Sequence, residues 1–105
     1  MKAKLVIRER IVFADSSLVE MVVWRVPRPV PPSRHSFKYR LVYIVAGKRM
    51  LGYDNERGKG DHRHIFGAEE SIEFSSIDDV LKRFVAEVEA MRSEESDEEA
   101  GGGRR

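Results

Sequence analysis

The chain has 105 residues, which is enough for one domain with a modest core and too few for two. It contains no cysteine, so a disulfide framework, a cysteine zinc site and a thiol nucleophile are all excluded. The net charge of +1 hides an uneven distribution, because residues 25–64 carry ten Lys and Arg but only three Asp and Glu. A basic middle of this kind indicates a polyanionic or acidic partner, or simply a well-solvated surface.

The first third of the chain predicts a β-hairpin. Residues 4–13 are rich in β-branched side chains and predict a strand, and residues 14–17 carry a turn signal. Residues 18–26 are apolar on both parities, which indicates a second strand that is central or covered on both sides. Residues 27–36 contain all four prolines and predict a stiff connecting loop.

The middle of the chain predicts more strands. Alternation over residues 37–46 indicates a third strand, and the glycine at position 47 suits a tight hairpin turn into a fourth strand over residues 49–54. Residues 55–64 are polar and glycine-rich, so we expect a loop there. Residues 70–74 predict a weak fifth strand.

The clearest element is an amphipathic helix near the C-terminus. Ser76 and Asp79 fit a capping box, and the helix is predicted to end at about Arg92. Its apolar positions recur at helical spacing: Ile77, Val80, Leu81, Phe84, Val85, Val88 and Met91. The predicted fold is therefore α+β, an antiparallel β-meander of four to five strands with one C-terminal amphipathic helix packed on it.

These elements divide the chain into a domain and a tail. Residues 1–92 are predicted to form a single α+β domain. Residues 93–105 contain no large apolar side chain and are predicted to be a disordered acidic and glycine-rich tail. The N-terminus shows no secretory signal and no window approaches the ~20 apolar residues that span a bilayer, so we expect a cytoplasmic protein with no membrane contact.

The segment over residues 53–64 is the best candidate for function. It combines glycines, which let backbone amides approach a ligand, with Lys, Arg and His, which suit phosphate oxygens and proton transfer. Gly58-Lys59-Gly60 lacks the spacing and the following Ser or Thr of a nucleotide-binding loop. A mobile, solvated surface loop is the alternative.

His62 and His64 are two residues apart, so in a strand their imidazoles would share one face. They could bind a metal with Asp54 or Asp61 as the third ligand, or act as general acid and base. We favour acid–base chemistry or phosphate contact and expect no metal, because basic neighbours would repel a cation. These neighbours are Arg57, Lys59 and Arg63.

Arg40 lies among apolar positions of the third predicted strand, where an arginine usually has an acidic partner. Asp54 is the natural candidate. The pair could be a scaffold ion pair or could take part in catalysis.

Several short motifs resemble the TumE-like toxin family of type II toxin–antitoxin systems. The resemblance covers about residues 4–92 and rests on Trp24-Arg25, Tyr39-Arg40-Leu41 and Tyr53-Asp54-Asn55, followed by His-x-His and one C-terminal helix. It implies a growth-inhibiting protein that is neutralised by direct binding of a helix-turn-helix antitoxin encoded beside it.

We therefore expect a toxin that acts on RNA as a metal-independent ribonuclease without an external cofactor. One of His62 and His64 would remove the 2′-hydroxyl proton and the other would protonate the leaving 5′-oxygen. Asp54 would orient a histidine or an arginine, and the negative charge on the phosphoryl oxygens would be stabilised by Arg57, Lys59 and Arg40. The expected RNA-binding residues are Tyr53, Asn55, Arg57, Lys59, Arg63 and His35. The alternatives are a non-catalytic module that binds nucleic acid or protein through the same surface, and an interaction protein whose helix and strand edge serve only a partner.

Overall fold

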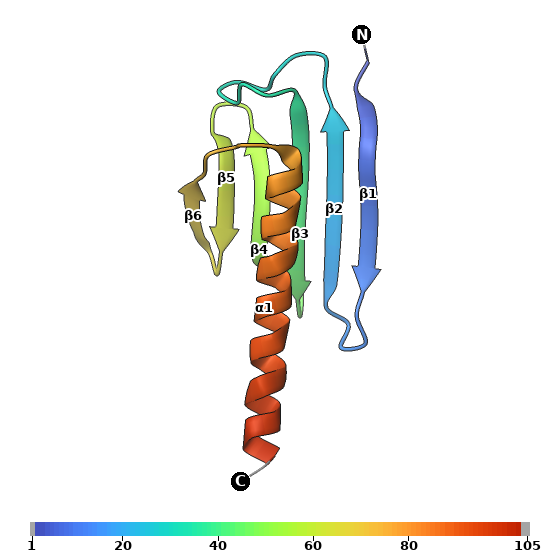
Figure 1. Cartoon of the computed structure of the whole chain (residues 1–105), viewed down its shortest axis with the longest axis vertical. Helices are drawn as coiled ribbons and strands as arrows, with labels where there is room; N and C mark the ends of the chain where they lie inside the picture. Colours follow the sequence, from blue (N-terminus) through green and yellow to red (C-terminus); the bar gives the residue numbers. More distant parts are fainter. Residues whose placement is uncertain (1, 104–105) are drawn as a thin grey trace.

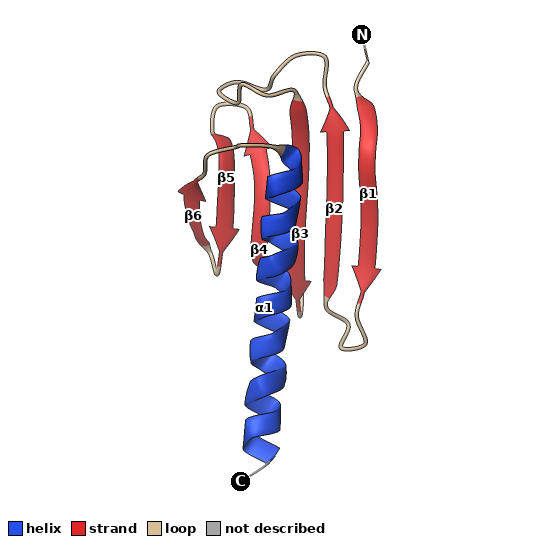
Figure 2. Cartoon of the chain, viewed as in Figure 1, coloured by secondary structure: helices blue, strands red, loops and turns tan. Residues whose placement is uncertain are grey.

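The computed structural model describes the backbone of residues 2–103 and the side chains of residues 2–94. Its six strands form one antiparallel sheet in which the spatial order equals the chain order (Figure 1). The strands are β1 (Lys4–Val12), β2 (Leu18–Arg25), β3 (Phe37–Val45), β4 (Lys48–Glu56), β5 (Gly60–Ile65) and β6 (Ala68–Ser71). One helix, α1 (Ile77–Gly103), lies across a single face of this sheet (Figure 2).

The α+β class, the antiparallel meander and the single C-terminal helix are confirmed, but the expected four to five strands are wrong. The segment over residues 55–64, predicted as a loop, is the end of β4 followed by a tight turn and most of β5. It was misread because β5 carries polar side chains on both faces, which hides the alternation of a half-buried strand. The predicted fifth strand over residues 70–74 corresponds to β6, which begins and ends earlier.

Glycines make the tight turns between the central strands. Ala46 and Gly47 both have positive φ, 51° and 77°, which is the backbone of a two-residue hairpin turn between β3 and β4. Between β4 and β5, Gly60 has a φ of 76°, and a Cβ built on it would lie 3.1 Å from Cγ of Pro32. The proline-containing loop therefore lies directly against this turn, where the Gly58 amide also donates to the Pro31 carbonyl over 2.8 Å.

The helix begins as predicted and covers the centre of the sheet. The Asp79 amide donates to Ser76 Oγ over 3.0 Å, which caps the first turn. Val80, Phe84 and Val88 are buried against β3 and β4, and each such side chain contributes about 1.5–3 kcal/mol by leaving water.

The far end of the helix differs from the sequence prediction. The helix continues past Arg92 to Gly103. Side chains beyond residue 94 and the backbone of residues 104–105 lie outside the described part, so the division into a domain and a disordered tail stays a prediction. No described stretch of α1 is long and apolar enough to cross a membrane.

Because the helix covers only one face of the sheet, the two faces differ in what they bury. The covered face carries the apolar core, and its fully buried members include Tyr39, Leu41 and Tyr53. The opposite face, which we call the open face, has no helix over it in the described structure (Figure 1). Side chains on that face must therefore bury one another if they are to be buried at all.

Candidate functional site

The β4–β5 hairpin sends alternate side chains to opposite faces of the sheet. Tyr53 points toward α1 and packs edge-on against an aromatic ring of the helix. Its neighbour Asp54 therefore points to the open face. The strand register pairs Asp54 with His62 and Gly52 with His64, so both imidazoles lie beside this carboxylate.

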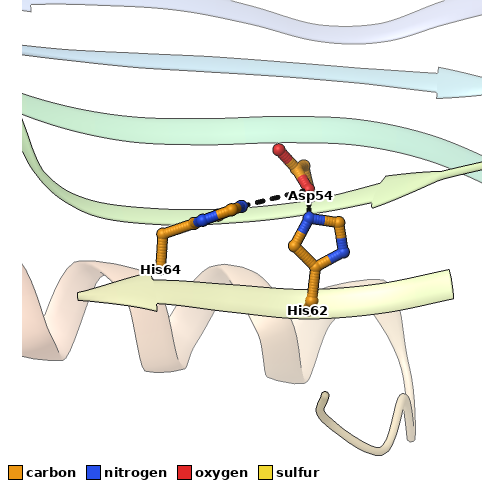
Figure 3. Close-up of side chains that lie close together, drawn as sticks. All are labelled: Asp54, His62 and His64. Atoms are coloured by element: carbon orange, nitrogen blue, oxygen red, sulfur yellow. Dashed lines mark ion pairs between the residues drawn. The ribbon is translucent and has the colours of Figure 1, made fainter. Parts of the chain in front are cut away.

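Asp54, His62 and His64 form a compact group that we call the Asp54 cluster (Figure 3). His62 Nε2 lies 2.5 Å from Asp54 Oδ1, and His64 Nε2 lies 3.8 Å from the same oxygen. The two imidazole centroids are 4.7 Å apart and the rings are steeply inclined, at 76°. These three facing atoms are buried, and none has a hydrogen bond of acceptable geometry within the described residues.

The position of the proton on His62 follows from its other nitrogen. His62 Nδ1 lies 2.9 Å from the Gly60 carbonyl oxygen, which can only accept a hydrogen bond. Nδ1 therefore carries the proton, and in the neutral ring Nε2 presents a lone pair to the Asp54 carboxylate. Two lone pairs 2.5 Å apart repel unless a cation, either a proton or a metal ion, lies between them.

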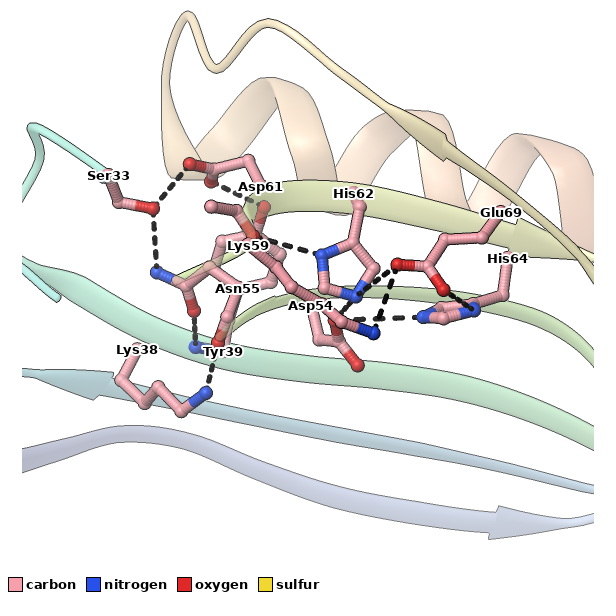
Figure 4. A network of polar contacts seen from close by, with 11 residues as sticks. Ser33, Lys38, Tyr39, Asp54, Asn55, Lys59, Asp61, His62, His64 and Glu69 are labelled. Atoms are coloured by element: carbon pink, nitrogen blue, oxygen red, sulfur yellow. Dashed lines mark hydrogen bonds and ion pairs between the residues drawn. The ribbon is translucent and has the colours of Figure 1, made fainter. Parts of the chain in front are cut away.

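His64 lies in a similar setting, with a carboxylate on its outer side. Its Nδ1 is 3.8 Å from Glu69 Oε2, and Glu69 Oε1 is 3.7 Å from His62 Nε2 (Figure 4). Burial lowers the pKa of His64 below its ordinary value of 6.5, and the nearby guanidinium of Arg49 lowers it further. His64 is therefore mostly neutral at pH 7.

A groove of about 400 Å³ runs over the open face beside the Asp54 cluster. Its lining combines three cationic and two acidic side chains with the ring of Trp24, and consists of Val22, Trp24, Lys38, Tyr39, Arg40, Arg49, Asp54 and Glu56. Three cations in so small a space favour a polyanion. Arg49 lies over Gly52, where a Cβ would come within 3.1 Å of its Cδ, so the glycine leaves room for this side chain.

Asp54 connects the groove to the histidines. One of its oxygens faces His62, and the other points away from both imidazoles (Figure 3). A ligand in the groove would therefore meet the carboxylate first and His62, which is 2% exposed, behind it.

A second His–Asp pair lies on the covered face. The Phe37 amide donates to His35 Nδ1 over 3.2 Å, so the proton is on Nε2 and is donated to Asp61 Oδ2 over 2.7 Å. Asp61 also accepts hydrogen bonds from Ser33 (2.6 Å) and from Tyr39 (2.7 Å) (Figure 4). We call Ser33, His35, Tyr39 and Asp61 the Asp61 cluster. Its donors and acceptors match one another.

Two residues predicted to bind RNA are engaged on the helix side. Tyr53 is buried, and its hydroxyl donates to Glu87 of α1. Burial, together with that carboxylate, raises the pKa of Tyr53 to about 12. Arg63 pairs with Glu87 and with Glu70. The structure therefore places these two side chains away from the groove.

The other predicted residues are distributed between the core, the turn and the groove. The side chain of Asn55 is buried and holds the β3 backbone by accepting from the Tyr39 amide over 3.0 Å. Arg57 lies exposed in the β4–β5 turn, and Lys59 is 3.4 Å from a carboxylate oxygen of Glu69. Arg40 lines the groove opposite Asp54, although the carboxylate faces His62 rather than this arginine.

Of the groove residues, only Arg40 and Asp54 were predicted as site residues, and those missed include Trp24, Lys38 and Arg49. Their alternation within the predicted strands could have placed Trp24 and Lys38 on the same face as Arg40 once the strand register was known. No local pattern singles out Arg49, because its place depends on a register shift between β3 and β4.

Comparison with known proteins adds one finding. The model of a protein family described as Toxin TumE matches residues 2–92. No curated protein and no solved structure gives a significant match.

Proposed function

Because the chain belongs to the TumE toxin family, we propose that it is the toxin of a toxin–antitoxin module and that it acts by cleaving RNA without a metal ion. Family membership implies an antitoxin partner, and we propose a helix-turn-helix protein encoded beside the toxin for that part. One observation carries the ribonuclease proposal. Asp54 lies where a groove with three cations meets two buried imidazoles.

The groove suits the backbone and bases of RNA. Arg40 and Arg49 are exposed and would contact phosphate oxygens, and Arg is suited to such contacts by its planar donor fork. Lys38 donates to the Asn55 carbonyl, which holds its charge over the groove. Trp24 is half-buried beside them and offers a ring on which an unpaired base can stack.

The reaction that fits this arrangement is transfer of the phosphoryl group to the neighbouring 2′-oxygen. Asp54 takes the 2′-hydroxyl proton, the 2′-oxygen attacks phosphorus, and the bond to the 5′-oxygen breaks. Arg40 and Arg49 stabilise the charge on the non-bridging oxygens. The Asp54–His62 pair holds the proton and returns it to the leaving 5′-oxygen. The products are a 2′,3′-cyclic phosphate and a 5′-hydroxyl.

The test is cleavage of labelled total RNA and short oligonucleotides by the purified full chain in the presence of EDTA. We expect products with 2′,3′-cyclic phosphate ends, and a loss of at least ~100-fold in rate for Asp54→Asn, because general acid–base catalysis contributes 10²–10⁴-fold. The matched control is Asp78→Asn, which removes an exposed carboxylate on α1 and should leave cleavage unchanged.

The alternative, a non-catalytic module, predicts a different pattern in the same experiment. RNA would bind with steep salt dependence and remain intact with the wild-type chain. Full cleavage by a folded Asp54→Asn protein would contradict the assignment of the site.

A further inference from the structure

We infer that Asp54, His62 and His64 form a binding site for one divalent transition-metal cation of the Zn²⁺ type, and that this cation inhibits cleavage by displacing the catalytic proton. The inhibitory part rests on the proposed function, whereas the binding part does not. The starting point is that one oxygen and two nitrogens, all buried and all without hydrogen-bond partners in the described structure, face a common point.

The identities of the atoms suit such a cation. Two imidazole nitrogens and one carboxylate oxygen are a common protein ligand set for Zn²⁺ and related ions. The three ligand atoms lie within 4.8 Å of one another, and the separations from Asp54 Oδ1 to the two Nε2 atoms are 2.5 Å and 3.8 Å. Ligands at ~2.0–2.2 Å from a tetrahedral Zn²⁺ are about 3.4 Å apart, so small side-chain rotations convert the group into a coordination shell.

The outer nitrogens are held as metal-binding histidines require. His62 Nδ1 donates to the Gly60 carbonyl, which leaves the Nε2 lone pair directed at the common point. His64 Nδ1 faces a carboxylate oxygen of Glu69 at 3.8 Å, a longer contact. Contacts of this kind to a carbonyl or a carboxylate fix the tautomer and orientation of a ligating imidazole.

From the sequence, basic neighbours were expected to repel a metal cation, but these side chains do not surround the site. Arg63 lies on the covered face and is paired with Glu87. Lys59 faces Glu69, whose carboxylate also adds negative charge beside both imidazoles. Arg57 is exposed in the turn, and Arg49, whose guanidinium lies near His64, is exposed to solvent at the groove. A divalent cation therefore meets two carboxylates at close range and mainly solvated or paired cations beyond them.

The lone pairs that would bind the metal are the same ones that would hold the proton during cleavage. A cation bound by Asp54 Oδ1 and His62 Nε2 occupies the position of the proton that the Asp54–His62 pair must hold and return. It also withdraws charge from the carboxylate, which weakens it as a base. Metal binding and metal-free cleavage are therefore mutually exclusive.

The binding test uses the full chain freed of metal by a chelator. Isothermal titration with Zn²⁺ is expected to show one site per chain, and Co²⁺ is expected to give the visible absorption of a low-symmetry complex. Asp54→Asn and His62→Gln should each bind at least ~10-fold more weakly, since each removes one of three ligands. The control is His35→Gln, which removes the histidine of the Asp61 cluster and should leave binding unchanged.

Thermal unfolding of each variant distinguishes the loss of a ligand from the loss of the fold. His64→Gln, at the more exposed of the two histidines, is an additional variant. Absence of a Zn²⁺ site in the wild-type chain, or full affinity in folded Asp54→Asn, would overturn the inference.

The cleavage test separates this inference from the proposed function. We expect RNA cleavage in EDTA that falls at least ~10-fold when Zn²⁺ saturates the site and that recovers on chelation. Zn²⁺ binding without cleavage under any condition supports the site and contradicts the ribonuclease. Cleavage in EDTA with no Zn²⁺ site supports the ribonuclease and overturns the site. Cleavage that requires the metal overturns both the inhibition and the metal-free reaction.

Discussion

The two His–Asp pairs of this small sheet show how the same residue types acquire different roles. In the Asp61 cluster, His35 receives a backbone amide hydrogen on Nδ1 and donates from Nε2 to Asp61. In the Asp54 cluster, His62 donates from Nδ1 to a backbone carbonyl and presents its lone pair to Asp54. In both pairs Nδ1 contacts the backbone and Nε2 faces the aspartate, so the backbone group, an amide in the first case and a carbonyl in the second, decides which nitrogen of the neutral ring carries the proton.

The difference teaches that burial alone does not identify a functional histidine. His35 is stacked on Phe74 at a centroid distance of 3.6 Å and is as much a part of the packing as an aromatic ring. His62 is more deeply buried, but its facing atoms need a cation to be stable together. A polar pair whose donor and acceptor match stabilises the fold, whereas a pair that presents two acceptors to one another is suited to take up a proton or a metal.

The sharpest test of this comparison is the same substitution at both aspartates. Asp61→Ala leaves the donors of Ser33, His35 and Tyr39 without an acceptor and should lower the free energy of unfolding by about 3 kcal/mol. Asp54→Ala removes a carboxylate whose buried oxygen has no hydrogen-bond partner among the described residues, and should change the free energy of unfolding by less than about 1 kcal/mol. Urea denaturation at pH 7 measures both, and equal losses would break the distinction between the clusters.

A smaller effect is expected from the turn that supplies the carbonyl for His62. Gly58 and Gly60 both have positive φ, so alanine at either position should cost about 1 kcal/mol in backbone strain. The added Cβ of Gly60→Ala would also contact Pro32, so the total cost of this variant should be about 2 kcal/mol. The two variants are compared by thermal unfolding. Only Gly60→Ala should also weaken Zn²⁺ binding, because it displaces the carbonyl that orients the imidazole.

The groove can be distinguished from the basic turn by its effect on RNA affinity. Arg49→Gln removes a cation beside Asp54 and should weaken binding about tenfold at low salt, uniformly across RNA sequences. Arg57→Gln removes an exposed cation of the turn and should have little effect. Fluorescence anisotropy with a labelled oligonucleotide at several salt concentrations checks both. A larger loss for Arg57→Gln would move the RNA-binding surface to the turn.

The smallest expected effect concerns the covered face and its dependence on pH. Burial by itself raises the pKa of Glu87, but hydrogen bonds from Arg63 and Tyr53 outweigh it and hold the pKa below the ordinary 4.5. A carboxyl with a depressed pKa stabilises the fold above its unfolded pKa, and this stabilisation is lost as the pH falls through the folded pKa.

Glu87→Gln should therefore lower stability by about 1 kcal/mol at pH 7 and by less below pH 4. Unfolding curves at both pH values measure the difference. Glu70→Gln, which alters a more exposed partner of Arg63, is the control and should show a weaker dependence on pH.

Sequence by itself determined the local features of this protein. The strands β2 and β3, the glycine turn after Ala46 and the Ser76 cap each follow from neighbouring residues and appear as predicted. The motifs around Asp54 also carried the family resemblance, which the match over residues 2–92 confirms. These features depend on short-range sterics and hydrogen bonding, which a single segment contains.

Only the tertiary structure decided which side chains meet. That β5 is a strand at all depends on its pairing with β4, because its own residues are polar on both faces. The same pairing places His62 against Asp54 and sends Arg63 to the helix, whereas a shift of one residue would exchange the two faces. The loop that carries His35 lies 26 residues from Asp61 in the chain, and no local pattern joins them. Strand register and the packing of distant segments are long-range properties, and in this protein they separate a His–Asp pair with matched hydrogen bonds from one whose facing atoms have no hydrogen-bond partner among the described residues.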